Sequence, residues 1–407
     1  MIGEARNPRG SVGRSMDLIL ALGLTAIAFG NLFLPGELQS LGGADYLVLV
    51  IGLMCAAALS RLLPALSSPY PWVVGIIVVL VALPGFVVGE ISSYGFTKAV
   101  TFGLVVLLLF ASAALDDPPR AVRVVLTVGL ALAVIVSVMV VFFGQTAENG
   151  RVSILGLNPV GVSRLAGVGL VTAAILFVGG HRGGLLSRPA LVGAATITAA
   201  AVVTTGSRGP IVSALLAVGV CVVLLLVARR VRKRWIALAG VLVLVLMIAA
   251  NRFGDRSVDL LGAGRGDSGR NILYDAAFLV MSQSPLGLGW GNFGTMFGWA
   301  NGEIFYPHNI FLEFGSEGGM VAFVGMAAIF AGVACVGARA YLRKNSLVTL
   351  IALSLYIYAL VNAQFSSDIV GNRMLWVFLA VVLALGRFEK IWSRPQVLAR
   401  TQESGMS

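Results

Sequence analysis

The chain has 407 residues and a formal net charge of +11 at pH 7; 58% of its residues are hydrophobic and 12% are charged. Soluble domains carry about 25% charged residues, so this composition excludes an ordinary soluble enzyme and predicts an integral membrane protein.

Apolar runs of about 18 residues or more can cross a hydrocarbon core of about 30 Å as helices. We predict twelve such helices, at residues 16–35, 45–63, 72–89, 98–115, 122–144, 164–180, 189–206, 209–228, 235–250, 309–337, 346–365 and 373–388. The first run leads into Leu34-Pro35-Gly36 without a small-residue cleavage site, so we expect a membrane helix there and no signal peptide. The expected fold class is an all-α membrane protein.

The positions of Lys and Arg predict the orientation of the chain in the membrane. With a cytoplasmic N-terminus and twelve crossings, twenty of the 29 basic residues fall in cytoplasmic segments, including the ARRVRKR cluster at 228–234. A basic cluster can bind nucleic acid, but beside two apolar runs it favours a topology signal that contacts anionic lipid. We expect both termini in the cytoplasm, with a tail at 391–407.

The basic residues left for the other face are nearly all arginines. They are Lys98, Arg151, Arg164, Arg208, Arg252, Arg256, Arg265, Arg270 and Arg373. The positive-inside bias disfavours cations on this side, and the planar fork of arginine suits phosphate oxygens. The pattern predicts an anionic ligand, a phosphate or diphosphate, on the outer face.

One outer loop, residues 251–307, is far longer than the others and separates helices at 1–250 from helices at 308–390. Loops longer than about 15 residues are usually functional or disordered, and this one is rich in large apolar side chains. Within it, RNILYDAAFLVMSQ at 270–283 has the spacing of a short helix with one buried face. SPLGLGWGNFG at 284–294 predicts tight turns at the membrane interface. We expect a folded cap over the outer mouth of the bundle.

His308 follows Pro307, a residue tolerated in the first turn of a helix, and opens the tenth apolar run. A helix N-terminus disfavours the protonated ring, so we expect a neutral imidazole that can accept a proton. The alternative is an interfacial histidine that caps the helix or bonds a carbonyl group.

A metal site is not expected. The only other histidine, His181, is assigned to the opposite face from His308. The aspartates that could hold a divalent ion, Asp255, Asp259 and Asp267, are irregularly spaced.

Arg208 lies in the turn TTGSRGPIV, where two apolar runs must form a hairpin. Small residues expose backbone N–H groups beside the guanidinium, and Pro210 opens the next helix with its positive dipole end nearby. This predicts a compact anion site. The alternative is an arginine that reaches lipid headgroups.

Arg270 is expected in the first turn of the short loop helix, with Arg265 upstream. Cations at a helix N-terminus are unfavourable unless an anion is bound there. The position of Arg270 therefore favours an anionic ligand at the start of this helix. The alternative is an ion pair with Asp267 or Asp275, and for Arg265 alone that alternative is preferred.

Glu317 lies nine positions after His308, which places it on about the opposite face of a regular helix. A carboxylate within an apolar run is costly and usually paired. We therefore expect Glu317 to be a structural residue that is linked to another helix.

Three stretches resemble one known family. The first is HNIFL at 308–312, followed by Glu317 and Gly319; the second is GSRG at 206–209; the third runs from Arg270 to PLGLGWGNF. Together they resemble the HN-x-x-L…E-x-G signature and preceding loop of the bacterial O-antigen ligase and O-antigen polymerase superfamily.

The resemblance implies a GT-C-like glycosyltransferase of the bacterial inner membrane with its active site facing the periplasm. Such proteins transfer a glycan from undecaprenyl diphosphate to an acceptor hydroxyl, which in ligases belongs to the lipid A core. His308 would be the base or an orienting group, Arg208 and Arg270 would hold the diphosphate, and Arg265 and Asn309 would assist substrate binding. No metal or other cofactor is implied.

Several alternatives stay open from the sequence. Within the superfamily they are an O-antigen polymerase and a protein O-glycosyltransferase, although no large C-terminal soluble domain is visible. A transporter or flippase is less favoured, because we find no internal repeat and the unusual polar residues gather at one surface. A membrane scaffold would not explain three motifs on one side.

Overall fold

The computed structural model describes residues 8–30, 40–41, 44–45, 50–54, 75, 78–79, 81–88, 93–146, 152–154, 157–178, 187–229, 240, 270–297 and 306–392. The helices are α1 (Pro8–Phe29), α4 (Pro84–Val87), α5 (Ser93–Ala113), α6 (Pro118–Phe143), α7 (Pro159–Val178), α8 (Arg188–Thr204), α9 (Arg208–Val227), α11 (Arg270–Gln283), the 3-10 helix η3 (Phe293–Phe297), α12 (Ile310–Lys344), α13 (Leu347–Asn362) and α14 (Arg373–Trp392). Strand β1 (Ser40–Leu41) pairs antiparallel with β2 (Ala44–Asp45), and β3 (Gln145–Thr146) with β4 (Val152–Ser153).

The protein is mostly helical, as its composition predicts. Within the described residues, α5, α6, α7, α9 and α12 are long and apolar enough to cross a membrane, and α8 and α13 are shorter apolar helices. The predicted runs 45–63 and 72–89 are described only in part, and of 235–250 only residue 240 is described. The number of twelve crossings and the GT-C-like fold therefore stay predictions.

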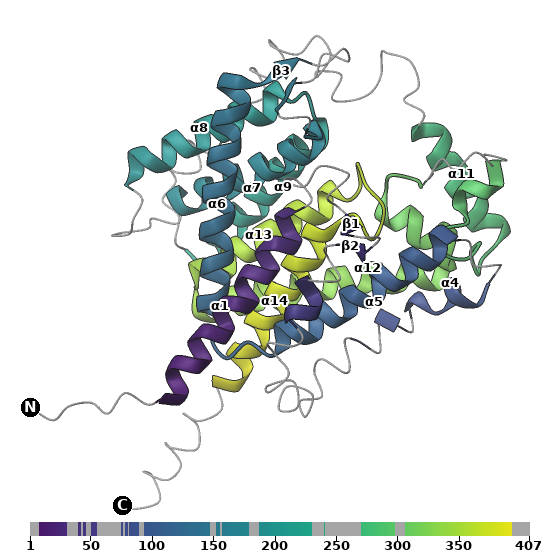
Figure 1. Cartoon of the computed structure of the whole chain (residues 1–407), viewed down its shortest axis with the longest axis horizontal. Coiled ribbons are helices and arrows are strands. Elements are labelled where there is room, and N and C mark those ends of the chain that lie inside the picture. The colour runs from purple at the N-terminus through teal and green to yellow at the C-terminus, as the bar shows by residue number, and fades with distance from the viewer. Residues whose placement is uncertain are drawn as a thin grey trace, which may run out of the picture.

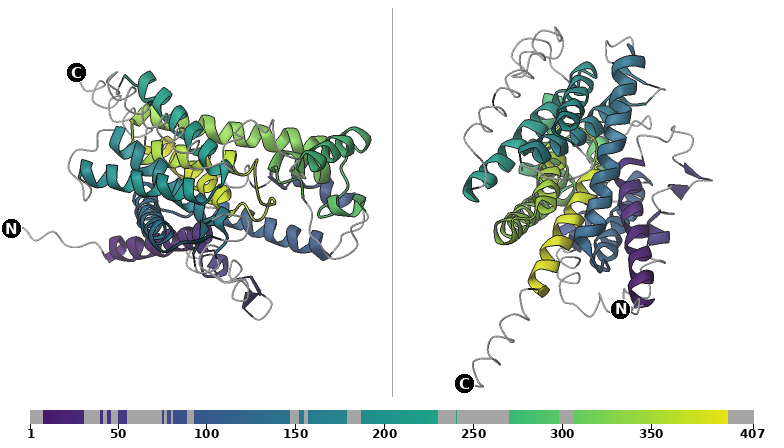
Figure 2. Two further views of the ribbon diagram at one scale, coloured as in Figure 1. Left: turned by 90° about the horizontal axis from the view of Figure 1, so that it is seen from above. Right: turned by 90° about the vertical axis from the view of Figure 1, so that its left-hand side faces the viewer.

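The helices form two groups joined by a central pair (Figures 1 and 2). Helices α6, α7, α8 and α9 pack together, and α4 and α11 pack on α12. Helices α13 and α14 lie between the groups, because α13 contacts α7 and α9 while α14 contacts α5 and α12.

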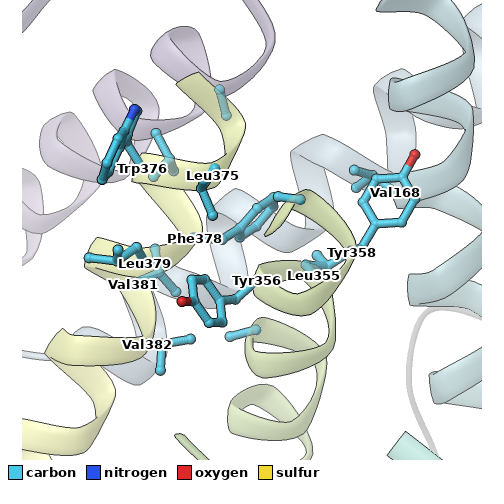
Figure 3. Close-up of a cluster of buried hydrophobic side chains, with 14 of the residues drawn as sticks. Val168, Leu355, Tyr356, Tyr358, Leu375, Trp376, Phe378, Leu379, Val381 and Val382 are labelled. Carbon is cyan, nitrogen blue, oxygen red and sulfur yellow. The ribbon is translucent and has the colours of Figure 1, made fainter. Parts of the chain in front are cut away.

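A layer of large buried side chains joins α13 and α14 (Figure 3). Trp376, Phe378 and Tyr356 are at most 1% exposed; Tyr358, also buried, points from α13 toward α7, where its hydroxyl donates to the carbonyl oxygen of Arg164. The Tyr356 hydroxyl donates to the carbonyl oxygen of Phe330 at 2.8 Å, and the Trp376 ring N–H donates to that of Ile369 at 2.8 Å. The Tyr356 hydroxyl and the Trp376 ring N–H are thus buried together with their hydrogen-bond partners, as buried polar groups in folded proteins usually are.

Polar contacts also mark the opposite end of the bundle. Asp17, early in α1, accepts hydrogen bonds from the backbone N–H groups of Asp116 and Asp117. Arg387, late in α14, donates to the carbonyl oxygen of Ala113. Residues of α1 and α14 thus both contact the segment at the end of α5.

Candidate functional site

The start of α12 is fixed by a cap and by a neighbouring connection. Asn309 is the N-cap residue, and its side-chain oxygen accepts from the N–H groups of Phe311 at 3.0 Å and Leu312 at 3.2 Å. The N–H of Ile310 donates to the carbonyl oxygen of Ala363 at 3.0 Å. The expected place of Pro307 in the first helical turn is wrong, because capping by Asn309 makes the helix begin at Ile310.

His308 immediately precedes this cap and has a backbone φ of +55°. This left-handed conformation is uncommon for a residue other than glycine, and such strain often occurs at functional sites. Its Nδ1 is buried and has no hydrogen-bond partner among the described residues. The ring of Tyr306 lies 4.4 Å from the imidazole, centroid to centroid.

The environment of His308 favours a neutral ring. Burial lowers the pKa of His308 below its ordinary value, the charge of Arg270 lowers it further, and Asp368 opposes the shift. The expected neutral imidazole is thus supported, with burial and the charge of Arg270 as causes. A neutral ring with an unpartnered nitrogen can accept a proton or a hydroxyl hydrogen bond.

Arg270 is the first described residue of α11, where the sequence analysis placed it. Its charge influences both His308 and Tyr274, so the guanidinium lies near the imidazole. Within the residues described, no ion pair joins Arg270 to Asp275. Asp267 and Arg265 lie outside the described residues.

Arg208 is the first residue of α9, directly after the short turn that follows α8, so the predicted hairpin is confirmed. Gly206 in this turn has a φ of +65°. Gly209 packs so closely on Phe365 that an added Cβ would lie 3.0 Å from the Phe365 Cβ. The start of α9 therefore lies against the connection between α13 and α14.

That connection, residues 363–372, links most parts of the site and was missed by the sequence analysis. The side chain of Asp368 accepts from the Tyr94 hydroxyl at 2.8 Å and from the N–H of Gly371 at 2.7 Å. The carbonyl oxygen of Gln364 accepts from the Tyr274 hydroxyl at 3.2 Å. The sequence signal was a polar stretch, QFSSD, between two apolar runs.

Arg164 of α7 also binds the 363–372 connection. Its Nη2 donates to the carbonyl oxygen of Ser366 at 2.8 Å and to the side-chain oxygen of Asn372 at 3.3 Å. The structure thus brings α5, α7, α9, α11 and α12 to one connection. Of the predicted outer-face arginines, Arg270 lies near His308, Arg164 binds the connection, and Arg208 begins the helix that packs on it through Gly209.

Two tyrosines lie close to this region: the ring of Tyr306 contacts the imidazole, and Tyr274 contacts Asn309 and Gln364. Burial raises the pKa of Tyr306 to about 12, with the charges of Asp368 and Glu313 adding to the shift. Burial likewise raises the pKa of Tyr274. Both phenols stay protonated at neutral pH; the Tyr274 hydroxyl donates to the Gln364 carbonyl oxygen, and a protonated Tyr306 can donate to a phosphate or sugar oxygen.

Lys98 is not available to a ligand, contrary to its inclusion among the outer-face cations. It is 1% exposed and lies 2.5 Å from Glu313 and in direct contact with Glu317. Glu317 also accepts from the N–H of Gly291 at 3.0 Å. The prediction that Glu317 is paired with another helix is confirmed, whereas the role of Glu313 was missed.

The glycine-rich stretch after α11 forms the predicted tight turns. Gly287, Gly289 and Gly291 have φ values of +82°, +86° and +75°. The N–H of Leu288 donates to the carbonyl oxygen of Ser316 at 2.9 Å, and that of Gly289 to Glu317 at 3.0 Å.

These turns insert at a break in α12. Gly319 interrupts α12 with a φ of +78°, and the N–H of Met320 donates to the carbonyl oxygen of Pro285 at 2.8 Å. Trp290 connects the same turns to α4 and the residues before it. Its backbone N–H donates to the carbonyl oxygen of Gly85, and its ring N–H donates to that of Ala82. The turns therefore stabilise both the end of α11 and the first part of α12, which flank the site.

In the described ranges, no group of three or more His, Cys, Asp or Glu side chains is placed to hold a metal ion. The site combines the cations Arg164 and Arg270 with the carboxylate of Asp368, which already accepts from Tyr94 and Gly371.

Comparison with known protein families found one match over part of the chain. A family model described as O-antigen ligase matches residues 193–327. The matched segment includes the Arg208 turn, Arg270, the glycine turns and His308, so it confirms the resemblance drawn from the motifs. No curated protein matches the chain.

Proposed function

From the O-antigen ligase domain that the chain carries at residues 193–327, we propose that the protein transfers O-antigen polysaccharide from undecaprenyl diphosphate to a sugar hydroxyl of the lipid A core. The reaction would take place on the periplasmic face of the inner membrane, in lipopolysaccharide biosynthesis. The observation that carries the proposal is the approach of Arg270 and of Asp368, in the 363–372 connection, to His308, whose buried Nδ1 has no hydrogen-bond partner among the described residues.

The required chemistry is a single displacement at the anomeric carbon. The acceptor oxygen forms a bond to this carbon as the bond to the diphosphate oxygen breaks, and the acceptor proton passes to His308. A neutral imidazole suits this role, because a general base must be unprotonated at the working pH. One in-line attack inverts the anomeric configuration.

The leaving diphosphate gains negative charge as its bond to the sugar breaks. Arg270 beside His308 and Arg208 at the start of α9 can neutralise that charge, which is the main task left to the protein when the leaving group is already good. Arg265 is proposed as a supporting contact. Transfer by this route is metal-independent, so treatment with a chelator should leave the rate unchanged.

Asn309 has a narrower role than the motif suggests. Its side-chain oxygen is used to cap α12, and its side chain also forms a hydrogen bond with Tyr274. We propose that it acts on the substrate through the position it gives to His308 and Tyr274.

A polymerase would use the same groups with another lipid-linked repeat unit as acceptor. Complementation separates the two functions. Expression in a ligase-null strain should restore long-chain lipopolysaccharide on a gel, and His308→Ala and Arg208→Ala should abolish it at equal protein levels. Restoration of chain length in a polymerase-null strain, without capped core in the ligase-null strain, would identify a polymerase instead.

A further inference from the structure

Helix α11 exposes large apolar side chains although it lies in a loop. Ile272, Leu279 and Leu286, just after the helix, are 57%, 51% and 61% exposed. A cap surrounded by water would leave this surface in an unfavourable environment. Exposed apolar surface of this kind, next to membrane helices, indicates contact with lipid or with another protein.

The faces of α11 are clearly divided. At 100° per residue, Leu273, Ala277 and Val280 share the face that is buried, while Ile272 and Leu279 form a separate exposed stripe that ends at the exposed Gln283, the last residue of the helix. The exposed residues Asn271, Asp275 and Ser282 lie beside that stripe and form a polar stripe. Phe278, also exposed, flanks the polar stripe on its other side, and aromatic rings are common at membrane interfaces.

The apolar stripe continues onto a membrane-spanning helix. Pro285, next to Leu286, accepts the N–H of Met320 at 2.8 Å. Met320, Val321 and Val324 of α12 are themselves 44%, 56% and 57% exposed, and α12 is long and apolar enough to cross a membrane. Helix α11 lies beside α12 in Figures 1 and 2.

Length decides how α11 meets the bilayer. Its 14 residues extend about 21 Å at 1.5 Å per residue, too short for a hydrocarbon core of about 30 Å. A helix with one protein face, one apolar stripe and one polar stripe lies in the interface, with its apolar side chains about 5–10 Å into the acyl boundary.

We infer that α11 is an interfacial helix whose Ile272–Leu279 stripe is embedded among the acyl chains of the bilayer, and not a cap surrounded by water. Arg270 lies on the opposite side of the helix, at about the same angle as Ala277 and Met281. The embedded stripe therefore sets Arg270 at the level of lipid headgroups. This step rests on the proposed function: the diphosphate of a membrane-anchored donor would lie at the same headgroup level as Arg270.

The test measures which medium surrounds each stripe. A fluorescent amino acid is introduced at Leu279, or at Ser282 as the matched polar-stripe control, in the full chain reconstituted in vesicles of phosphatidylethanolamine and phosphatidylglycerol. Phospholipid carrying a nitroxide high on the acyl chain reports lipid contact, and iodide reports water. We expect the nitroxide to quench most of the emission at position 279 and iodide to quench little, with the reverse at position 282.

Strong iodide quenching at position 279 would show a water-exposed helix, and protection from both quenchers would show a protein contact; either result overturns the inference. Because the measurement uses no substrate, it can contradict the interfacial position of α11 without contradicting glycan transfer. Loss of transfer in the wild type with the expected quenching would instead overturn the proposed function alone.

A kinetic measurement supplements the optical one. The double variant Ile272→Asn/Leu279→Asn should raise KM for the lipid-linked donor several-fold with little change in kcat, and Ser282→Asn should change neither. An unchanged KM in the double variant would contradict the assigned position of Arg270.

Discussion

His308 combines a left-handed backbone, a buried nitrogen without a partner and a neighbouring cation. None of these features stabilises the folded chain. Burial of the ring and the charge of Arg270 both favour the unprotonated imidazole. At the scale of single residues, this is the pattern expected of a group retained for its chemistry.

Replacement of His308 by asparagine should separate chemistry from folding. Asparagine adopts the left-handed conformation more readily than most residues, so His308→Asn should unfold at or above the wild-type temperature. Transfer should fall by about 10²–10⁴-fold, the usual contribution of a general base. Near-wild-type turnover by a well-folded His308→Asn protein would contradict the assignment.

The pH dependence tests the environment of His308. Because its folded-state pKa lies below the ordinary value, the active neutral form dominates at pH 7, and kcat/KM should decline only as the pH falls below about 6.5. Arg270→Met removes a charge that disfavours the imidazolium, so this acid limb should move to higher pH.

Arg270→Lys is the control, because it keeps the positive charge and should leave the acid limb near its wild-type position. Both variants can lower the absolute rate through weaker diphosphate binding, so the position of the limb is the readout. A limb that stays fixed in Arg270→Met would show that the two groups do not interact.

At the scale of elements, α5, α12 and the turns after α11 are joined by buried charge. Lys98 of α5 meets Glu313 and Glu317 of α12, and Glu317 also binds the turn at Gly291. Removal of one partner from a buried ion pair leaves an uncompensated charge and costs about 3–5 kcal/mol.

Lys98→Met should therefore lower the unfolding temperature markedly in detergent. The triple variant Lys98→Met/Glu313→Gln/Glu317→Gln should recover much of the loss, because no unpaired charge remains. Wild-type stability of the single variant would show that the carboxyl groups do not depend on Lys98.

The glycine turns offer a second test at this scale. A Cβ at Gly289 would overlap the carbonyl oxygen of Val88, and its φ of +86° disfavours any other residue. Gly289→Ala should destabilise the protein by more than about 1 kcal/mol. Gly103→Ala, in α5 with no atom within 4 Å of the added Cβ, should be tolerated; equal losses in both variants would contradict a specific role for the turn.

At the scale of the whole molecule, the sequence predicted local features better than long-range ones. Apolar runs located the described membrane helices, and the positions of Arg270 and the glycine turns followed from spacing and composition. These features depend on neighbours within a few residues, which periodicity reports directly.

The contacts that assemble the site could not be predicted in this way. Tyr94 and Asp368 are 274 positions apart, and Lys98 and Glu317 are 219 apart. A single sequence contains no pattern that indicates pairing between residues so far apart. A lysine near the end of a helix is therefore interpreted as a surface cation. Three of the contacts of the 363–372 connection, with Arg164, Tyr274 and Ile310, are made by its backbone carbonyl groups, which every residue carries.

The most direct test of the account is transfer by the purified protein in vesicles, with a labelled glycan on undecaprenyl diphosphate and lipid A core as acceptor. The account predicts that the wild type joins label to the core and releases the diphosphate carrier, and that His308→Asn, folded to the same extent, loses this product. Equal product from both proteins, or carrier release by the wild type without any acceptor product, would contradict it.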